Sequence, residues 1–320
     1  MIHIVGHKNP DTDSIVSAIV MADYFQKTGK QSKAFRTGKI NRETKFILDK
    51  IKIKPPYLVE NLAKKKVFLV DHNEKEQAGT GIERAEIFGI LDHHKLGGMK
   101  TKEPIYIRIE PIGSTCTLIF KLFQEMNFQL SKNQAFLLLS GILSDTLKFT
   151  SPTTTKEDKK AAEILAKISQ QNINILSQEM FRVRSNISGI KLEDLIFSDY
   201  KEYKEEDLIF GIGVHETLNP EVLLKKEKEI FSILQRFKKE KKLNLFFFAL
   251  VDILKRKTYL FLTGEKEKEI AEKAFKKRAK RINPLLSPSL PLGKAKENLL
   301  LLPGVVSRKK QIVPPILKVL

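Results

Sequence analysis

Histidine and aspartate residues gather in three short segments, each of which directly follows an apolar stretch. The first segment, GHKNPDTDS, carries His7, Asp11 and Asp13 after the residues IHIV. The second, DHNE, begins at Asp71 after VFLV, and the third, DHH, follows EIFGIL. Several carboxylates close together need a compensating cation, and mixed carboxylate and imidazole ligands suit Mn²⁺, Fe²⁺, Co²⁺ or Zn²⁺. The three segments therefore predict a divalent-metal centre.

The alternative interpretation is that each aspartate forms a turn or caps a helix, as most single aspartates after a strand do. Against it, four of the six histidines lie in the same segments: His7, His72, His93 and His94. A fourth segment, SDTLKFTSPT, adds Asp145 after a long apolar run. Together the segments hold enough ligands for two ions with one shared carboxylate. Two neighbouring ions are a common device for hydrolysing phosphoryl bonds.

The elements that must position these segments alternate between short apolar strands and helices, which is typical of a parallel α/β sheet. Expected strands cover residues 2–5, 33–36, 67–70, 87–91 and 105–109, and expected helices cover residues 14–28, 42–50, 115–126, 132–144 and 155–170. Ser14 is the expected N-cap of the first helix. Because the carboxyl ends of parallel strands meet at one edge of a sheet, we expect the four segments to converge.

The segment PIGSTCTLI allows two interpretations. Gly113, Ser114 and Thr115 could present backbone N–H groups to an anion at the start of a helix. They could equally form an ordinary N-cap, which is the interpretation that we favour.

Two domains are expected, because the periodicity weakens near residues 181–194, where serine, asparagine and glycine cluster. The first, over residues 1–185, is predicted to be a doubly wound α/β domain with a mostly parallel sheet and to bind the metal. Residues 186–192 form the predicted linker. A smaller C-terminal α/β domain is expected over residues 193–320.

Composition fits a soluble globular protein, with 42% hydrophobic and 30% charged residues among 320. No apolar run is long enough to span a membrane, and no secretory signal is expected at the start. The single cysteine, Cys116, is expected to be buried and fits a reducing cytoplasm, which is the predicted location.

The formal charge of +19 raises a further alternative, a basic nucleic-acid-binding protein without catalysis. The lysines, however, are mixed with glutamates in runs such as LKKEKEI and FKKEKK, and no aromatic residues interleave them as stacking platforms would. This alternative also leaves the aspartate and histidine segments unexplained. We therefore expect a solvated basic surface and no nucleic-acid partner.

Taken together, GHKNPDTDSIVSA, VDHNE, LDHHKLG and SDTLKFTSPT resemble the DHH phosphoesterase superfamily, and in particular its manganese-dependent, family II inorganic pyrophosphatases. The resemblance extends through FRTGKINRETKFIL, YIRIEPIGSTCTLI and LLPGVVSRKKQIVPP, and it covers nearly the whole chain in order. It implies hydrolysis of inorganic pyrophosphate to two phosphates by two Mn²⁺ ions, with a bridging hydroxide as the nucleophile, in a cleft between two domains. It also implies Co²⁺ as an alternative metal, a further Mg²⁺ or Mn²⁺ that arrives with the substrate, and a homodimer.

The resemblance also implies which residues bind the metal. His7 and Asp11 correspond to ligands of one ion, and Asp13 to a ligand of the other. Asp71 corresponds to the bridging carboxylate. The ligands that complete the second ion's site are His93 and Asp145. Asp92 is expected to orient the loop and the histidine pair rather than to bind metal.

Substrate contacts are implied in both halves of the chain. His94 corresponds to a residue that contacts phosphate and assists protonation of the leaving group. Arg308 and Lys309 of the SRKK segment correspond to a phosphate clamp, for which a planar guanidinium and a compact ammonium are suited. A further substrate lysine of the family aligns with Ile190, so we assign its role to the neighbouring Lys191.

The second enzymatic alternative is a DHH-family phosphodiesterase that acts on short oligonucleotides or cyclic dinucleotides. Such enzymes resemble the first half of the chain but have a different C-terminal domain with a glycine-rich GGGH-like motif. That motif is absent from the sequence, whereas SRKK is present.

Overall fold

The computed structural model describes residues 1–197, 199–276, 279–281, 298–307 and 311–320. The chain divides into two compact units, Met1–Arg184 and Ser185–Leu320. The predicted linker, 186–192, falls at the start of the second unit. It follows helix α6 (Ile173–Arg184) and reaches the first residue of helix α7 (Leu192–Ile196).

The first unit contains a six-stranded sheet in the order β3-β2-β1-β4-β5-β6, and every neighbouring pair is parallel. The strand order reverses between β1 and β4, so the carboxyl ends of these two strands flank the point where α/β sheets usually bind ligands. The strands are β1 (Ile2–Val5), β2 (Ser32–Arg36), β3 (Tyr57–Leu58), β4 (Lys66–Val70), β5 (Glu86–Asp92) and β6 (Tyr106–Ile109).

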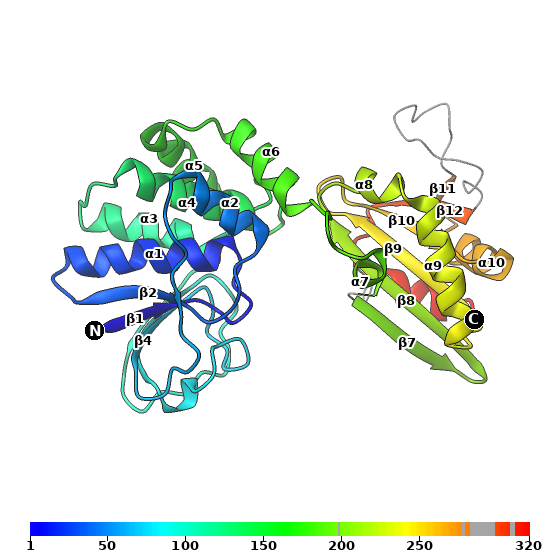
Figure 1. Cartoon of the computed structure of the whole chain (residues 1–320), viewed down its shortest axis with the longest axis horizontal. Helices are drawn as coiled ribbons and strands as arrows, with labels where there is room; N and C mark the ends of the chain where they lie inside the picture. Colours follow the sequence, from blue (N-terminus) through cyan, green and yellow to red (C-terminus); the bar gives the residue numbers. More distant parts are fainter. Residues whose placement is uncertain (198, 277–278, 282–297, 308–310) are drawn as a thin grey trace. The chain divides into compact units, whose positions relative to one another are not determined.

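Helices cover one face of this sheet, as Figure 1 shows. They are α1 (Thr12–Lys27), α2 (Arg42–Lys50), α3 (Thr115–Glu125), α4 (Lys132–Asp145), α5 (Lys156–Ser169) and α6. Loops and the short 3₁₀ helix η1 (Ile82–Arg84) pack against the other face, where Val5, Leu69 and Ile82 belong to one buried apolar cluster. The buried core holds the strands rigidly, so that their polar carboxyl ends have fixed positions.

Helix α1 begins at Thr12, and its N-cap is Asp11, whose side chain accepts the N–H of Ser14 at 2.9 Å. The prediction of Ser14 as the cap is therefore wrong. The Ser14 hydroxyl instead accepts the backbone N–H of His7 at 3.2 Å. A Cβ at Gly6 would lie 1.8 Å from Ser14 Oγ, so glycine allows the loop to close onto the helix.

The second unit contains another six-stranded sheet, in the order β11-β12-β10-β9-β8-β7. Its strands pair antiparallel except for β8 with β9, which are parallel. The strands are β7 (Asp199–Glu205), β8 (Leu208–Thr217), β9 (Leu245–Asp252), β10 (Lys257–Leu262), β11 (Lys280–Arg281) and β12 (Leu299–Pro303).

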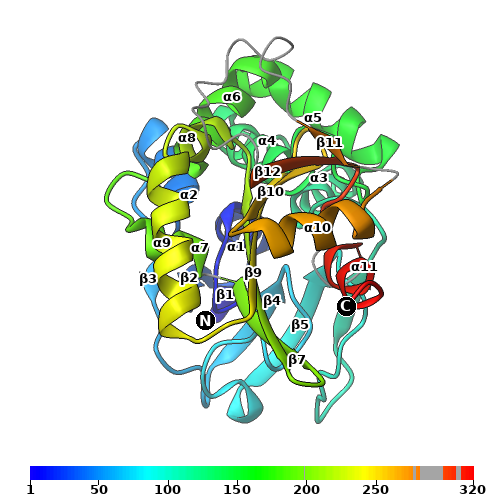
Figure 2. The ribbon, with the colours of Figure 1, turned by 90° about the vertical axis from the view of Figure 1, so that its right-hand side faces the viewer.

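Both faces of the second sheet are covered by helices. Strand β9 is buried along its whole length, and its side chains alternate between two apolar clusters. One cluster includes α7, α8 (Glu221–Leu224) and α9 (Glu227–Glu240), and the other includes α10 (Glu265–Ala274) and α11 (Val313–Leu317). Figure 2 shows α9 on one side of this sheet and α10 and α11 on the other.

The predicted fold class, a mostly parallel α/β domain followed by a smaller α/β domain, is confirmed. The strand order reverses as in the predicted doubly wound sheet, but η1 and loops, rather than longer helices, cover the second face. Cys116 is buried and free, as expected. None of the helices in the described ranges is long and apolar enough to cross a membrane.

Candidate metal centre

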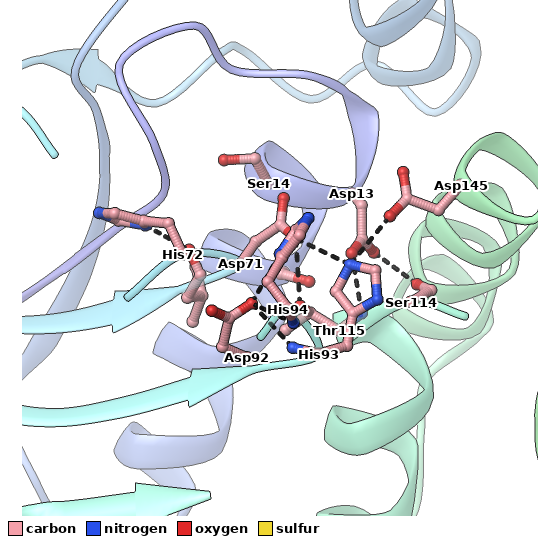
Figure 3. A network of polar contacts seen from close by, with 12 residues as sticks. Asp13, Ser14, Asp71, His72, Asp92, His93, His94, Ser114, Thr115 and Asp145 are labelled. Carbon is pink, nitrogen blue, oxygen red and sulfur yellow. Dashed lines mark hydrogen bonds and ion pairs between the residues drawn. The ribbon is translucent and has the colours of Figure 1, made fainter. Parts of the chain in front are cut away.

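Three groups of metal-ligating side chains meet at the carboxyl ends of β1, β4 and β5. Figure 3 shows five of their members, Asp13, Asp71, His93, His94 and Asp145. Within each group, one donor atom from every residue lies within 4.8 Å of the others, and Asp71 belongs to all three. The groups are His7 with Asp11 and Asp71; Asp13 with Asp71, His93 and Asp145; and Asp71 with His93 and His94. This arrangement could hold two cations with one shared carboxylate.

Asp71 lies at the centre of these groups and is almost fully buried. It directly follows β4 with a left-handed backbone (φ 63°), a conformation that Asp and Asn tolerate better than most residues. One carboxylate oxygen lies 3.3 Å from His7 Nε2, and the other lies 3.3 Å from His93 Nε2. Burial alone would raise the pKa of Asp71, but the two imidazoles outweigh it and lower the pKa.

Asp13 is held by the first turn of α3. Its carboxylate accepts the hydroxyl of Ser114 at 2.6 Å and the backbone N–H groups of Thr115 and Cys116 at 2.8 and 3.2 Å. A helix N-terminus favours such an anion. Burial and the charge of Asp71 nevertheless raise the pKa of Asp13 to about 7, so a bound cation would favour its ionised form.

The donor atoms of His93 and Asp145 fit a divalent cation. His93 Nδ1 lies 3.0 Å from the carbonyl of Ile112, so its N–H donates there and the neutral ring keeps its lone pair on Nε2. Nε2 is buried and lies 3.2–3.3 Å from Asp145 and Asp71, and among the described residues it has no partner in hydrogen-bond geometry. Burial and the charge of Asp13 raise the pKa of Asp145 well above its usual range. A cation among these atoms would give His93 Nε2 a partner and would balance the negative charges of Asp71 and Asp145.

Asp92 organises the loop behind the histidines. It is fully buried and accepts the backbone N–H groups of His93 and His94, and it also accepts His94 Nδ1–H at 2.9 Å. The side-chain amide of Asn73 donates to its other oxygen. Hydrogen bonding to Asp92 raises the pKa of His94, although burial opposes the effect. The contacts agree with the orienting role predicted for Asp92.

The comparisons with known proteins agree with this geometry. Residues 1–142 match the DHH family, N-terminal domain, and residues 178–319 match the DHHA2 domain. A manganese-dependent inorganic pyrophosphatase of Methanothrix thermoacetophila is 36% identical over 317 residues, which cover 98% of this chain and 97% of that protein. A probable manganese-dependent inorganic pyrophosphatase of an Exiguobacterium species is 38% identical over 313 residues, 97% of this chain and 96% of that protein. The chain belongs to the family of manganese-dependent inorganic pyrophosphatases.

A solved structure agrees with this family membership. The crystal structure of a Methanococcus jannaschii protein assigned to the family II inorganic pyrophosphatases matches with a TM-score of 0.65 and 36% identity. The match covers 100% of this chain and 99% of that one. The resemblance to the manganese-dependent pyrophosphatases is thus confirmed along the whole chain.

All six predicted metal ligands lie in the three groups, and the third group also contains His94. The other predicted substrate residues belong to the second unit. Lys191 is exposed and directly precedes α7. Arg308 and Lys309 lie outside the described residues.

Several contacts around these ligands are not evident from the sequence. Ser114 is the N-cap of α3, as favoured, yet the N–H groups of the same turn also bind an anion, the carboxylate of Asp13. The N-cap interpretation is therefore confirmed, and the N–H groups of this turn are already paired with carboxylates of the chain itself. The Thr115 hydroxyl also donates to Asp71 at 3.2 Å. His72, in contrast, is buried with Nδ1 at 2.9 Å from the carbonyl of Val70, and it belongs to none of the three groups.

Binding of Mn²⁺ is expected to release protons and to strengthen as the pH rises. Burial opposes protonation of His7 and His93, but neighbouring aspartates raise their pKa values to about 10 and about 12. Both rings are thus protonated at neutral pH in the metal-free chain. A histidine must lose its proton from the ligating nitrogen, so protons compete with the metal below these pKa values.

Calorimetric titration of Mn²⁺ near neutral pH, in two buffers of different ionisation enthalpy, measures this release. We expect at least about one proton per chain, and an affinity that falls as the pH is lowered. A heat that is independent of the buffer would contradict the assignment of these histidines as ligands.

Proposed function

We propose that the chain hydrolyses inorganic pyrophosphate to two phosphates with two Mn²⁺ ions bound at this centre. The observation that carries the proposal is the sharing of Asp71 by all three groups of donor atoms. The names of full-length relatives support both the metal and the substrate. When bound, the ions lower the pKa of water, so that a nucleophile forms near neutral pH, and they offset negative charge on phosphate oxygens.

The metal ligands are assigned by group. His7 and Asp11 would hold one ion, and the other would be held by Asp13, His93 and Asp145, with Asp71 shared. The first turn of α3 keeps Asp13 oriented, and the carbonyl of Ile112 keeps His93 Nε2 unprotonated once the metal is present. Co²⁺, with the same preference for imidazole and carboxylate, is proposed as an alternative metal.

The remaining site residues are proposed to bind phosphate. His94 is 48% exposed, and because its Nδ1 is held by Asp92, Nε2 is free to contact substrate and to protonate the leaving group. The cationic substrate ligands of the family correspond by sequence to Arg308, Lys309 and Lys191. The substitution Arg308→Ala is expected to raise the KM for pyrophosphate, and an unchanged KM would contradict this role. A further Mg²⁺ or Mn²⁺ is proposed to enter with the highly charged substrate.

The oligomeric state, cellular location and partners of the enzyme are proposed from the same resemblance. We propose a homodimer in the cytoplasm with no nucleic-acid or membrane partner. The free, buried Cys116 is compatible with a reducing compartment. Sedimentation equilibrium of the purified chain tests the oligomeric state, and a monomer at micromolar concentration would contradict it.

The proposed function is tested by phosphate release from pyrophosphate in the presence of Mn²⁺, Co²⁺ or Mg²⁺, with a short RNA and a cyclic dinucleotide as rival substrates. We expect metal-dependent hydrolysis of pyrophosphate and little cleavage of the nucleotides. Cleavage of the nucleotides without hydrolysis of pyrophosphate would instead support the phosphodiesterase. Salt-sensitive RNA binding without any hydrolysis would support a nucleic-acid-binding protein.

A further inference from the structure

Glu43, in the first turn of α2, is a buried carboxylate that belongs to none of the three metal-ligating groups. Only 2% of its surface is exposed. Its Oε2 accepts the hydroxyl of Ser144 at 3.2 Å and lies 3.7 Å from Nη1 of Arg184. Its Oε1 is buried and has no hydrogen-bond partner within the described part of the chain. A buried acid with so few partners costs stability, so its presence calls for a functional reason.

The contacts of this first turn lead to two segments that carry metal ligands. Ser144 directly precedes Asp145 at the end of α4, and it is 101 residues away from Glu43 in the sequence. Beside Glu43, the hydroxyl of Thr44 lies 3.2 Å from the hydroxyl of Thr12, which stands between Asp11 and Asp13. The first turn of α2 therefore bonds to the segments on both sides of the metal centre.

The position of this turn is itself well fixed. Asn41 caps α2 by accepting the N–H of Thr44 at 2.7 Å. Arg184, which supplies positive charge to Glu43, is the last residue of α6 and of the first unit. Glu43 thus receives contacts from α4 and α6 while its own helix is anchored at its start.

We propose that Glu43 is a positioning residue for the metal centre. By accepting the Ser144 hydroxyl, it fixes the end of α4 and so the distance of Asp145 from the ligands on the α1 loop. Arg184 lies 3.7 Å from this carboxylate and partly offsets the cost of its burial, which raises the pKa of Glu43. The effect on Mn²⁺ binding stands by itself, whereas its consequence for catalysis rests on the proposed function.

The test is the equilibrium affinity for Mn²⁺, measured from the electron paramagnetic resonance signal of free Mn²⁺ without any turnover. Glu43→Ala and Ser144→Ala are each expected to weaken binding about ten-fold, because outer residues that orient metal ligands typically contribute about ten-fold or more. The double variant is expected to be little weaker than either single one, since both changes remove the same contact. Glu43→Gln, which keeps an acceptor oxygen, is expected to recover part of the affinity.

Asp49→Asn is the matched control, because Asp49 is an exposed carboxylate on the same helix, paired with Lys45. Its affinity for Mn²⁺ should equal that of the unaltered chain. An affinity within two-fold of normal in folded Glu43→Ala would overturn the proposal, even with a lowered melting temperature, since Glu43 would then only stabilise the fold. Where Glu43→Ala fails to fold, unchanged affinity in Ser144→Ala overturns it equally. Normal Mn²⁺ binding without pyrophosphate hydrolysis in the unaltered chain would refute the proposed function and leave this inference intact.

Discussion

Asp71→Asn is expected to abolish metal-dependent hydrolysis of pyrophosphate, with kcat reduced by about a thousand-fold or more. Asp71 is the one residue common to all three groups of donor atoms, and it lies 3.3 Å from both His7 and His93. Asparagine has nearly the same size and tolerates the left-handed backbone at φ 63°, so the substitution removes the charge with little added strain. A neutral amide cannot serve as an anionic ligand for two cations.

The measurement is the rate of phosphate release at saturating Mn²⁺, with circular dichroism to verify that the variant is folded. Asp49→Asn again serves as the control, because it makes the same chemical change at an exposed carboxylate. We expect that control to keep its full rate. Near-normal manganese-dependent turnover by Asp71→Asn would refute the role of Asp71 as the carboxylate shared by two cations.

Gly141→Ala is expected to damage the metal centre from within α4. A Cβ at this position would lie 2.3 Å from Sγ of Cys116 and 2.8 Å from Oδ1 of Asp13, both of which are buried. Replacing a helical glycine by alanine ordinarily stabilises a helix by about 1 kcal/mol. Here the added methyl group would overpack the helix against Cys116 and Asp13. We therefore expect the free energy of unfolding to fall by about 1–3 kcal/mol instead of rising.

The displacement of Asp13 should also weaken Mn²⁺ binding by about ten- to a hundred-fold. Chemical denaturation and Mn²⁺ titration measure the two effects separately. Gly98→Ala is the control, because a Cβ at Gly98 would meet no atom within 4 Å. A Gly141→Ala variant that is more stable and binds Mn²⁺ normally would show that Asp13 does not depend on this packing.

The metal centre was predictable because its ligands follow strands whose apolar character is evident in the sequence. In a parallel sheet, those strand ends meet whatever the details of the loops. Hence His7, Asp71 and His93 could be brought together without coordinates. The N-cap of α1 was harder to predict, because Asp11 and Ser14 are both good caps. Only the contact between Ser14 and His7 decides between them.

Glu43 illustrates what the sequence does not reveal. A glutamate in the first turn of a helix is ordinarily an exposed residue that interacts with the helix dipole. Its burial depends on Ser144 and Arg184, which only the tertiary fold brings to it. Strand β7 escaped prediction for a related reason: DYKEYKE is a charged edge strand with little apolar periodicity. Both features are set by packing rather than by local pattern.

Anomalous scattering at the manganese absorption edge, from crystals of the chain grown with Mn²⁺, tests the shared centre most directly. We expect two Mn²⁺ peaks, both in contact with the carboxylate of Asp71. One peak should also contact His7 and Asp11, and the other should contact Asp13 and His93. A single peak, or two peaks of which only one contacts Asp71, would contradict a two-metal centre with Asp71 as the shared ligand.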